Sequence, residues 1–334
     1  MSVNIVFSNP SKTYLPGDYV SGKVLLTTKD PISARYMEIT WKGESKCNFG
    51  GSESSNVQRH LAGTFMGWIA KDGVDTIPAG TLKSRFRFRL PENSPPSFCG
   101  MFGEIEYSVT VEFDRPWRLK LKMMNTFRVV QKTNLTLSEP KMMKYAEFVK
   151  SKNSGTIFKD GLFLLKLHFS KRAFLAGETI RALAIMENHS TKPIINLRFE
   201  LIQQSHYHSR PQKSLCSLND CHSDCPIESK YRRDGETVLR GANYSCDVAP
   251  GEVKYINVEI DLPNGLPPTF ESPMISMGYL LGFTLRNGSL TGNRLACNAR
   301  IVVGSEETID EMVDECEPTK KSQCLTASPP PYHP

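Results

Sequence analysis

Hydrophobic and polar residues alternate over short stretches along most of this chain. The pattern is clearest in four ranges: 35–42, 83–90, 104–113 and 118–130. In the second range, Phe86, Phe88 and Leu90 take every other position, and polar or basic residues fill the positions between them. A period of two places successive side chains on opposite faces of a sheet, so each range is predicted to be a half-buried β-strand. Because Gly, Pro, Asn and Asp bound these runs, and helical periodicity is absent from the first half, we predict an all-β fold of antiparallel strands in a sandwich.

One nine-residue phrase occurs twice, 172 residues apart. Residues 90–98 and 262–270 both read Leu-Pro-x-x-x-Pro-Pro-x-Phe. Apolar positions within 15–41 recur 160 residues further along the chain. Two registers preserved over such distances indicate one module present twice. Because the registers differ by 12 residues, the second copy is predicted to carry an insertion between Leu201 and Leu262.

We therefore predict two domains of the same fold, a linker between them and a tail after them. With 334 residues, the chain is long enough for each domain to bury its own core. The predicted ranges are 1–140 for the first domain, 141–159 for the linker, 160–304 for the second domain and 305–334 for the tail. The linker prediction depends on the basic, polar composition of this stretch, which closes on Ser-Lys-Asn-Ser-Gly at 151–155.

The net charge of +6 is divided unevenly. Residues 305–334 carry seven acidic and two basic side chains, a net charge of −5, so residues 1–304 carry +11. A basic body and an acidic tail favour an anionic partner, or a tail that folds back on the body. A short amphipathic helix at 308–317 could dock in that way and block the basic surface. A solvated tail on an ordinary basic surface is the simpler alternative.

Two rows of basic residues are the candidate anion-facing or cargo-facing sites. They comprise Lys83, Arg85, Arg87 and Arg89 in one strand, and Arg118, Lys120 and Lys122 in another. The strand that matches the first row in the second module has Asn257, Glu259 and Asp261 instead, so the first module is the better candidate. Each row could equally be the solvated face of a half-buried strand. We expect no nucleic acid partner, because no recognised binding motif accompanies the charge.

Histidine and cysteine residues gather in the predicted insertion. The set comprises His206, His208, Cys216, Cys221, His222 and Cys225. Thiolate and imidazole are the usual zinc ligands, which makes Cys216, Cys221, His222 and Cys225 candidate metal ligands. The spacing lacks the Cys-x2-Cys pairs of a strong zinc site, so an inserted loop without metal is favoured and no cofactor is expected. A zinc-dependent sensor remains the alternative.

The chain resembles the α-arrestins, the arrestin domain-containing proteins. Four features together carry the resemblance: Tyr-Leu-Pro-Gly-Asp at 14–18, Asp-Arg-Pro-Trp at 114–117, the doubled nine-residue phrase, and the terminal Pro-Pro-x-Tyr. It covers about residues 1–304 and the end of the tail. It implies two tandem immunoglobulin-like arrestin β-sandwiches with a flexible C-terminal tail, their concave faces turned to a membrane or cargo.

The resemblance also implies a function. The family's best understood role is that of an adaptor, which binds membrane cargo and recruits a HECT-type ubiquitin ligase through the WW domains of the ligase. In this chain, the residues that match the WW-binding Pro-Pro-x-Tyr motif are Pro329, Pro330 and Tyr332. A polyproline II segment has little conformational entropy to lose on binding, which suits a WW groove. Taken alone, such a terminus could be an inert tail, and one motif where many relatives have two implies lower avidity.

The expected protein is a cytoplasmic adaptor without catalytic activity. It would be recruited to the plasma membrane and endosomes to promote ubiquitination and endocytosis of its cargo, with anionic phospholipid as a further candidate partner. The absence of a secretory signal and of a phosphate-binding or nucleophile motif agrees with this view. Nine cysteines, an odd number, read as reduced thiols. The alternative is a coat-like sorting subunit of the retromer type without a ligase link.

Overall fold

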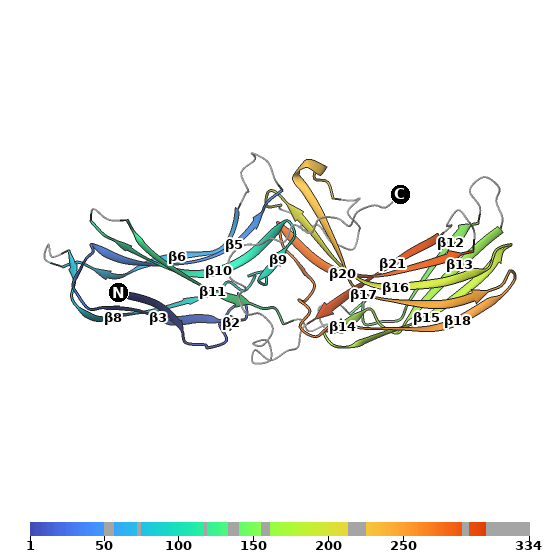
Figure 1. Ribbon diagram of the computed structural model, residues 1–334, viewed down its shortest axis with the longest axis horizontal. Coiled ribbons are helices and arrows are strands. Elements are labelled where there is room, and N and C mark those ends of the chain that lie inside the picture. Colours follow the sequence, from blue (N-terminus) through green and yellow to red (C-terminus); the bar gives the residue numbers. More distant parts are fainter. Residues whose placement is uncertain are drawn as a thin grey trace.

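The computed structural model describes residues 1–49, 57–71, 75–116, 119–132, 140–154, 161–212, 225–288 and 294–304. These residues form two β-sandwiches that lie end to end along the long axis of the molecule (Figure 1). Within the described part of the chain, no helix is long and apolar enough to cross a membrane. The predictions on the WW-binding residues Pro329, Pro330 and Tyr332, and on a helix at 308–317, lie outside the described residues.

The first sandwich packs two sheets, antiparallel except for the short strand β2, on one core. Its strands are β1 Ser2–Phe7, β2 Thr13–Tyr14, β3 Tyr19–Thr28, β4 Ile32–Ser33, β5 Tyr36–Cys47, β6 Val57–Ile69, β7 Thr76–Ile77, β8 Gly80–Arg89, β9 Phe98–Gly100, β10 Gly103–Asp114 and β11 Leu121–Val129. One sheet has the order β1-β3-β8 and the other the order β2-β11-β10-β5-β6, with β9 on β10; β4 pairs with β7. Strand β2 joins β11 in parallel.

The second sandwich repeats this arrangement. Its elements are β12 Ala146–Asn153, β13 Gly161–Phe169, β14 Ala173–Leu175, β15 Thr179–Ser190, β16 Ile194–His208, the 3₁₀ turn η3 Ser229–Tyr231, β17 Arg232–Val248, β18 Val253–Asp261, β19 Phe270–Glu271, β20 Ile275–Asn287 and β21 Arg294–Gly304. Its sheets have the orders β12-β13-β15-β18 and β14-β21-β20-β16-β17, with β19 on β20. Except for the extra strand β12, each strand has a counterpart in the first sandwich, so the predicted tandem fold is confirmed.

The doubled phrase performs the same structural task in both domains. The hydroxyl of Tyr107 donates to the carbonyl of Pro95 at 2.7 Å, and that of Tyr279 donates to the carbonyl of Pro267 at 2.7 Å. Both tyrosine side chains are fully buried, and they belong to β10 and β20, the middle strands of the two larger sheets. The prolines cannot donate to a ladder, so their free carbonyls are available for a side-chain donor. The sequence repeat is therefore a repeat of hydrogen bonds.

A tight turn is repeated as well. Gly17 and Gly177 have φ of +86° and +85°, a conformation that only glycine adopts without strain. In the turns that contain them, the backbone amides of Asp18 and Glu178 donate to the carbonyls of the residues three positions earlier, at 3.1 and 3.2 Å. The Pro-Gly signal at the first turn and the Ala-Gly pair at the second thus mark the same entry into a long strand.

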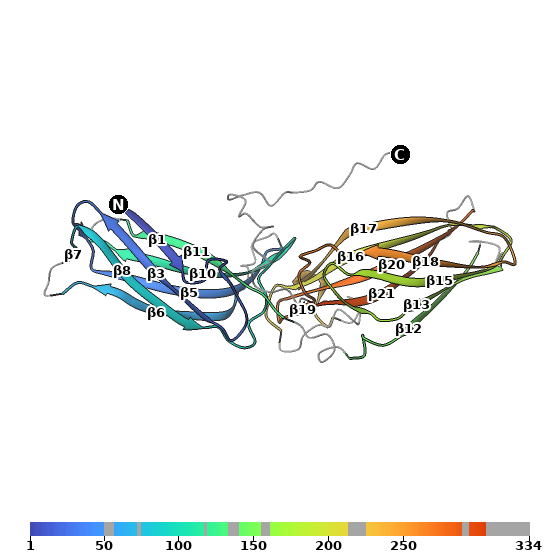
Figure 2. The ribbon, with the colours of Figure 1, turned by 90° about the horizontal axis from the view of Figure 1, so that it is seen from below.

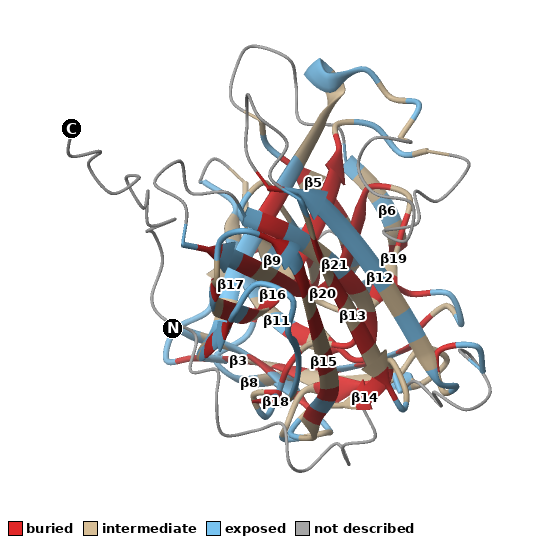
Figure 3. Ribbon diagram, turned by 90° about the vertical axis from the view of Figure 1, so that its right-hand side faces the viewer, coloured by how far each residue is buried: buried red, intermediate tan, exposed pale blue. Residues whose placement is uncertain are grey.

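The alternation predicted for residues 83–90 is confirmed in β8. Phe86 and Phe88 are buried, while the basic residues at the alternating positions of the strand are exposed. The ring of Phe88 stacks parallel on Trp41 of the facing sheet, with centroids 4.8 Å apart. Figure 3 shows the same division across the second domain, where buried residues follow the central strand β20 and exposed ones follow the edge strand β12.

Two features of the second domain bear on the sequence predictions. The predicted insertion lies in the β16–β17 hairpin, whose strands have 15 and 17 residues where β5 and β6 have 12 and 13. The predicted linker 141–159 contains strand β12, which pairs with β13 from Ala146 to Asn153. Because β12 is an edge strand with mostly exposed side chains, its composition is polar and resembles that of a linker.

The two sandwiches meet where the doubled phrases end, a contact region that we call the domain seam. Phe98 and Phe270, the last residues of the two phrases, pack edge to face with centroids 5.4 Å apart. Phe102 packs in the same way on Tyr207, at 5.7 Å. The thiol of Cys47 lies 3.9 Å from the carbonyl of Met274. Apolar burial thus continues from one domain into the other.

Candidate functional site

The outward face of the sheet β1-β3-β8 carries five basic side chains and no acidic one. Its alternate positions, which are the odd-numbered residues of β3 and β8 and the even-numbered ones of β1, point away from the core. The strands lie side by side in Figure 2. We call this surface the basic face; its charged residues are Lys23, Lys83, Arg85, Arg87 and Arg89. Four of the five were predicted from the sequence, and Lys23 was not.

The register of β3 and β8 concentrates charge at the centre of the basic face. Lys23 lies directly opposite Arg85. Like charges in opposed positions on a sheet repel each other, and a bound anion would relieve that repulsion. Towards one end, the Arg87 guanidinium lies 4.0 Å from the ring centroid of Tyr19, and Arg89 pairs with Glu92. Among the residues that the structure describes, only Arg89 of the five basic residues thus has a carboxylate partner, and the centre of the charged face lies at Lys23, Lys83 and Arg85.

The matching face of the second domain is neutralised within the sheet. Arg181 pairs with Glu259 at 2.9 Å, and Lys166 pairs with Glu187 at 2.5 Å. The hydroxyl of Thr179 donates to Asp261 at 2.7 Å. In the second domain, the strands that correspond to those of the basic face thus carry carboxylates and ion pairs instead of a row of cations. The contrast predicted from the aligned strands is present in the structure.

The second predicted row lies on the other sheet of the first sandwich. Lys120 pairs with Glu112 at 2.5 Å, and Lys122 is the register partner of the same carboxylate. Arg118 lies outside the described residues. Strand β11 begins only at residue 121, so the alternation expected from 118 does not hold, and Leu119 is 89% exposed. The structure does not bring the two rows together, and Glu112 partly neutralises the second.

A further cationic hollow was not predicted. It has a volume of about 360 Å³ on the second domain, and its basic residues are Arg198, Arg286 and Arg294 from three adjacent strands. Arg198 pairs with Glu200 at 2.6 Å. These arginines are far apart in the sequence, and only the pairing of β16, β20 and β21 brings them together. Each arginine is a single basic residue in its own strand, so the amino-acid sequence contains no pattern that predicts the hollow.

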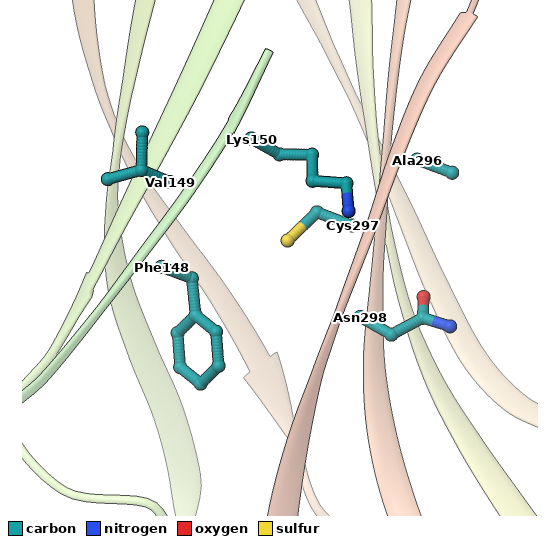
Figure 4. Close-up of a pocket in the computed structure, with 6 residues that line it drawn as sticks. All are labelled: Phe148, Val149, Lys150, Ala296, Cys297 and Asn298. Atoms are coloured by element: carbon teal, nitrogen blue, oxygen red, sulfur yellow. The ribbon is translucent and has the colours of Figure 1, made fainter. Parts of the chain in front are cut away.

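A pocket of about 390 Å³ lies between β12 and β21 (Figure 4). Lys150 points towards Cys297, and Phe148 lies beside the thiol. Burial raises the pKa of the Cys297 thiol, an effect that the charge of Lys150 only partly offsets. A protonated thiol is a poor nucleophile, so this pocket lacks an activated group of the kind that a cysteine enzyme requires.

The metal-ligand candidates divide into described and undescribed residues. Cys216, Cys221 and His222 lie outside the described residues. Cys225 is described, and its sulfur lies 3.3 Å from Nε2 of His208. His206 lies beside both. The structure therefore places one predicted ligand, Cys225, beside His206 and His208, two histidines of the same set that were not among the predicted ligands.

Both halves of the chain match arrestin domains. Residues 3–136 match the family model of the arrestin (or S-antigen) N-terminal domain, and residues 159–308 match that of the C-terminal domain. Residues 137–158, which include strand β12, lie between the two matches.

Relatives with arrestin domains are found in several animals. The chain is 28% identical to arrestin domain-containing protein 17 of Caenorhabditis elegans over 225 residues, which is 62% of this chain and 52% of the relative. It is 25% identical to arrestin domain-containing protein 4 of Mus musculus over 58% of this chain and 50% of the relative, and 25% identical to the human arrestin domain-containing protein 1 over 62% and 47%. The chain spans about half the length of these relatives.

With both domain models matched and two sandwiches of the same topology in the structure, the chain belongs to the arrestin family, in its α-arrestin branch.

Proposed function

We propose that this chain is a trafficking adaptor that works by binding alone. Its first domain would attach to an anionic membrane surface that contains the cargo, and its tail would recruit a WW-domain HECT ubiquitin ligase. The adaptor would reside in the cytoplasm, be recruited to the plasma membrane and endosomes, and promote ubiquitination and endocytosis of the cargo. The observation that carries the membrane half of the proposal is the basic face, a set of five cations of which only Arg89 has an ion-pair partner within the described ranges, on one of two otherwise matching sheets.

The basic face is suited to a flat anionic surface. Its basic residues lie on the two adjacent strands β3 and β8 of one sheet, so they can approach a surface together rather than one at a time. Each basic residue close to an anionic membrane surface strengthens binding by roughly fivefold. The attraction is electrostatic and acts over about 10 Å at moderate ionic strength, so binding should weaken as salt is added. The second domain, with its internal ion pairs, would contribute less.

The proposed ligase contact uses the terminal Pro-Pro-Pro-Tyr sequence. Pro329 and Pro330 would pack into the aromatic groove of a WW domain, with the ring of Tyr332 in an adjacent pocket. The prolines restrict the unbound segment to extended conformations, so little entropy is lost on binding.

Replacing Tyr332 by alanine is expected to remove WW binding. An aromatic anchor in a pocket commonly supplies much of the affinity of a small interface, so at least a roughly tenfold loss is expected. The measurement is titration of the full chain with an isolated, fluorescently labelled WW domain of a HECT ligase. His333→Ala, next to the motif but not part of it, is the control that should bind normally. Equal affinity of wild type and Tyr332→Ala would exclude this motif as the contact.

Neutralising the centre of the basic face is expected to weaken membrane binding. The double variant K83Q/R85Q should bind vesicles of phosphatidylserine and phosphatidylcholine about 30-fold more weakly than wild type at low salt. The matched variant K120Q/K122Q removes the same charge from the other sheet, where Lys120 is paired with Glu112 and Lys122 lies opposite that carboxylate, and should have a much smaller effect. The measurement is vesicle co-sedimentation. Equal losses in the two variants would show that net charge, rather than the basic face, controls binding.

A further inference from the structure

Three metal-ligating side chains converge at the end of β16. His206 and His208 lie on the same face of this strand, each only 3% exposed. Cys225 reaches them from the segment before η3. One donor atom from each residue lies within 4.8 Å of the others. We propose that these residues bind a zinc-type transition-metal ion.

The spacing of the donor atoms fits a tetrahedral ion. Nε2 of His206 lies 2.9 Å from Nε2 of His208, which in turn lies 3.3 Å from Sγ of Cys225. Zinc bonds of usual length at tetrahedral angles place two nitrogen ligands about 3.3 Å apart, and a nitrogen and a sulfur about 3.6 Å apart. For these two pairs, shifts of only a few tenths of an ångström would give the ideal spacing, and the third pair, His206 and Cys225, lies within 4.8 Å. Three protein ligands leave one tetrahedral position for a water molecule or another donor.

Both histidines are oriented as metal ligands usually are. Nδ1 of His206 lies 2.5 Å from a carboxylate oxygen of Asp234, on the neighbouring strand β17, and Nδ1 of His208 lies 3.3 Å from the carbonyl of Pro273. An imidazole N–H that donates to a carboxylate or carbonyl fixes the ring and leaves its other nitrogen unprotonated. Each Nε2 then presents a lone pair to the centre of the cluster.

The same hydrogen bonds create an electrostatic problem that a cation would solve. With both Nδ1 atoms as donors, the two neutral rings direct lone pairs at each other across 2.9 Å, and the sulfur of Cys225 adds a third electron-rich atom. A metal ion at the centre converts this repulsion into three bonds. An extra proton on one ring, or the thiol proton of Cys225 donated to Nε2 of His208, would also relieve it, and these are the competing arrangements that the experiment must separate.

The donor set selects the class of ion. Two imidazoles and one thiolate are borderline or soft ligands, which favour Zn²⁺ and its neighbours in the first transition row over Mg²⁺ or Ca²⁺. The ion would be structural. It would connect β16 to the returning segment of the long hairpin, and Asp234 would hold β17 to the same centre. Tyr207, between the two histidines, packs on Phe102 of the first domain, so the ion would also stabilise one side of the domain seam.

The test is the metal content of the purified full chain. After exposure to Zn²⁺ and removal of loosely bound ions, mass spectrometry of the elements should find one zinc per chain. The variants H208A and C225S should each lose it. C99S, which alters an exposed thiol of the first domain, and H168A, which alters a histidine of β13, are the matched controls and should retain it. Substituted Co²⁺ should show a thiolate-to-metal charge-transfer band that is absent from C225S.

Two further readouts separate a bound ion from a metal-free cluster. A chelator should lower the Tm of wild type and leave that of C225S unchanged. Asp234→Asn should weaken zinc binding by about 10- to 100-fold without removing it, because Asp234 positions a ligand rather than binding the ion. Absence of stoichiometric metal in wild type, or zinc retained at full stoichiometry in both H208A and C225S, would overturn the proposal.

Discussion

Replacing Tyr279 by alanine is expected to destabilise the second domain by about 4–6 kcal/mol. Deleting a buried aromatic ring costs about 3–5 kcal/mol, and leaving the partly buried Pro267 carbonyl without its donor adds about 1 kcal/mol, the low end for an unsatisfied group. Tyr279 is fully buried at the centre of β20, and its hydroxyl satisfies the carbonyl of Pro267. Burial raises the pKa of this hydroxyl, so it remains a donor across the physiological pH range. The expected loss approaches the whole stability of many domains.

Chemical denaturation followed by circular dichroism would measure this effect. The control is Tyr279→Phe, which keeps the ring and removes only the hydroxyl, and should cost about 1–2 kcal/mol. Because Tyr107 makes the same hydrogen bond to Pro95 in the first domain, Tyr107→Ala should destabilise that domain by a similar amount. A cost below about 1 kcal/mol for Tyr279→Ala would contradict the structural role given to the doubled phrase.

Replacing Gly100 by valine is expected to force the domain seam open. A Cβ atom at this position would lie 2.1 Å from the hydroxyl of Tyr207 and 2.7 Å from the ring of Phe98. Tyr207 cannot withdraw easily, because it is fully buried and packed on Phe102. Inserting side-chain atoms into a packed region costs about 1–3 kcal/mol, and occasionally more, unless the structure moves apart. Here the two domains can separate, so loss of the seam is the expected response.

Alkylation of Cys47 would report on that opening. In the closed seam its thiol is 2% exposed, and burial raises its pKa to about 12, so it should react very slowly with iodoacetamide at neutral pH. In Gly100→Val the thiol should react at least roughly tenfold faster, as judged by mass spectrometry of the peptide that contains it. Gly241→Val is the matched control, since a Cβ there meets only ordinary contacts. An unreactive Cys47 in Gly100→Val would show that the seam accommodates the side chain.

Much of the fold could be predicted from the sequence because its information is local and repeated. The alternation of Phe86 and Phe88 with basic residues determines which face of β8 is buried. The doubled phrase indicated two modules of the same fold before any contact between them was known. Strand β12 could not be recognised in the same way, because an edge strand with exposed side chains has the polar composition of a linker.

The candidate sites were harder to predict because they depend on cross-strand partners. Lys120 and Lys122 look as basic as Lys83 and Arg85 in the sequence, but only the structure places Glu112 beside them. The spacing of the histidine and cysteine residues matches no zinc motif, so the sequence favours a loop without metal. It forms because two alternate residues of β16 share a face with a cysteine that returns from the far end of the hairpin, a relation that no fixed sequence spacing encodes.

The most direct test of the adaptor proposal is whether the chain can connect a WW domain to a membrane. A labelled WW domain, vesicles that contain phosphatidylserine, and the full chain would be mixed at low salt and sedimented. We predict that the WW domain sediments with the vesicles when wild-type chain is present and stays in solution with either Tyr332→Ala or K83Q/R85Q. Sedimentation of the WW domain with both variants, or its absence with wild type, would contradict the account.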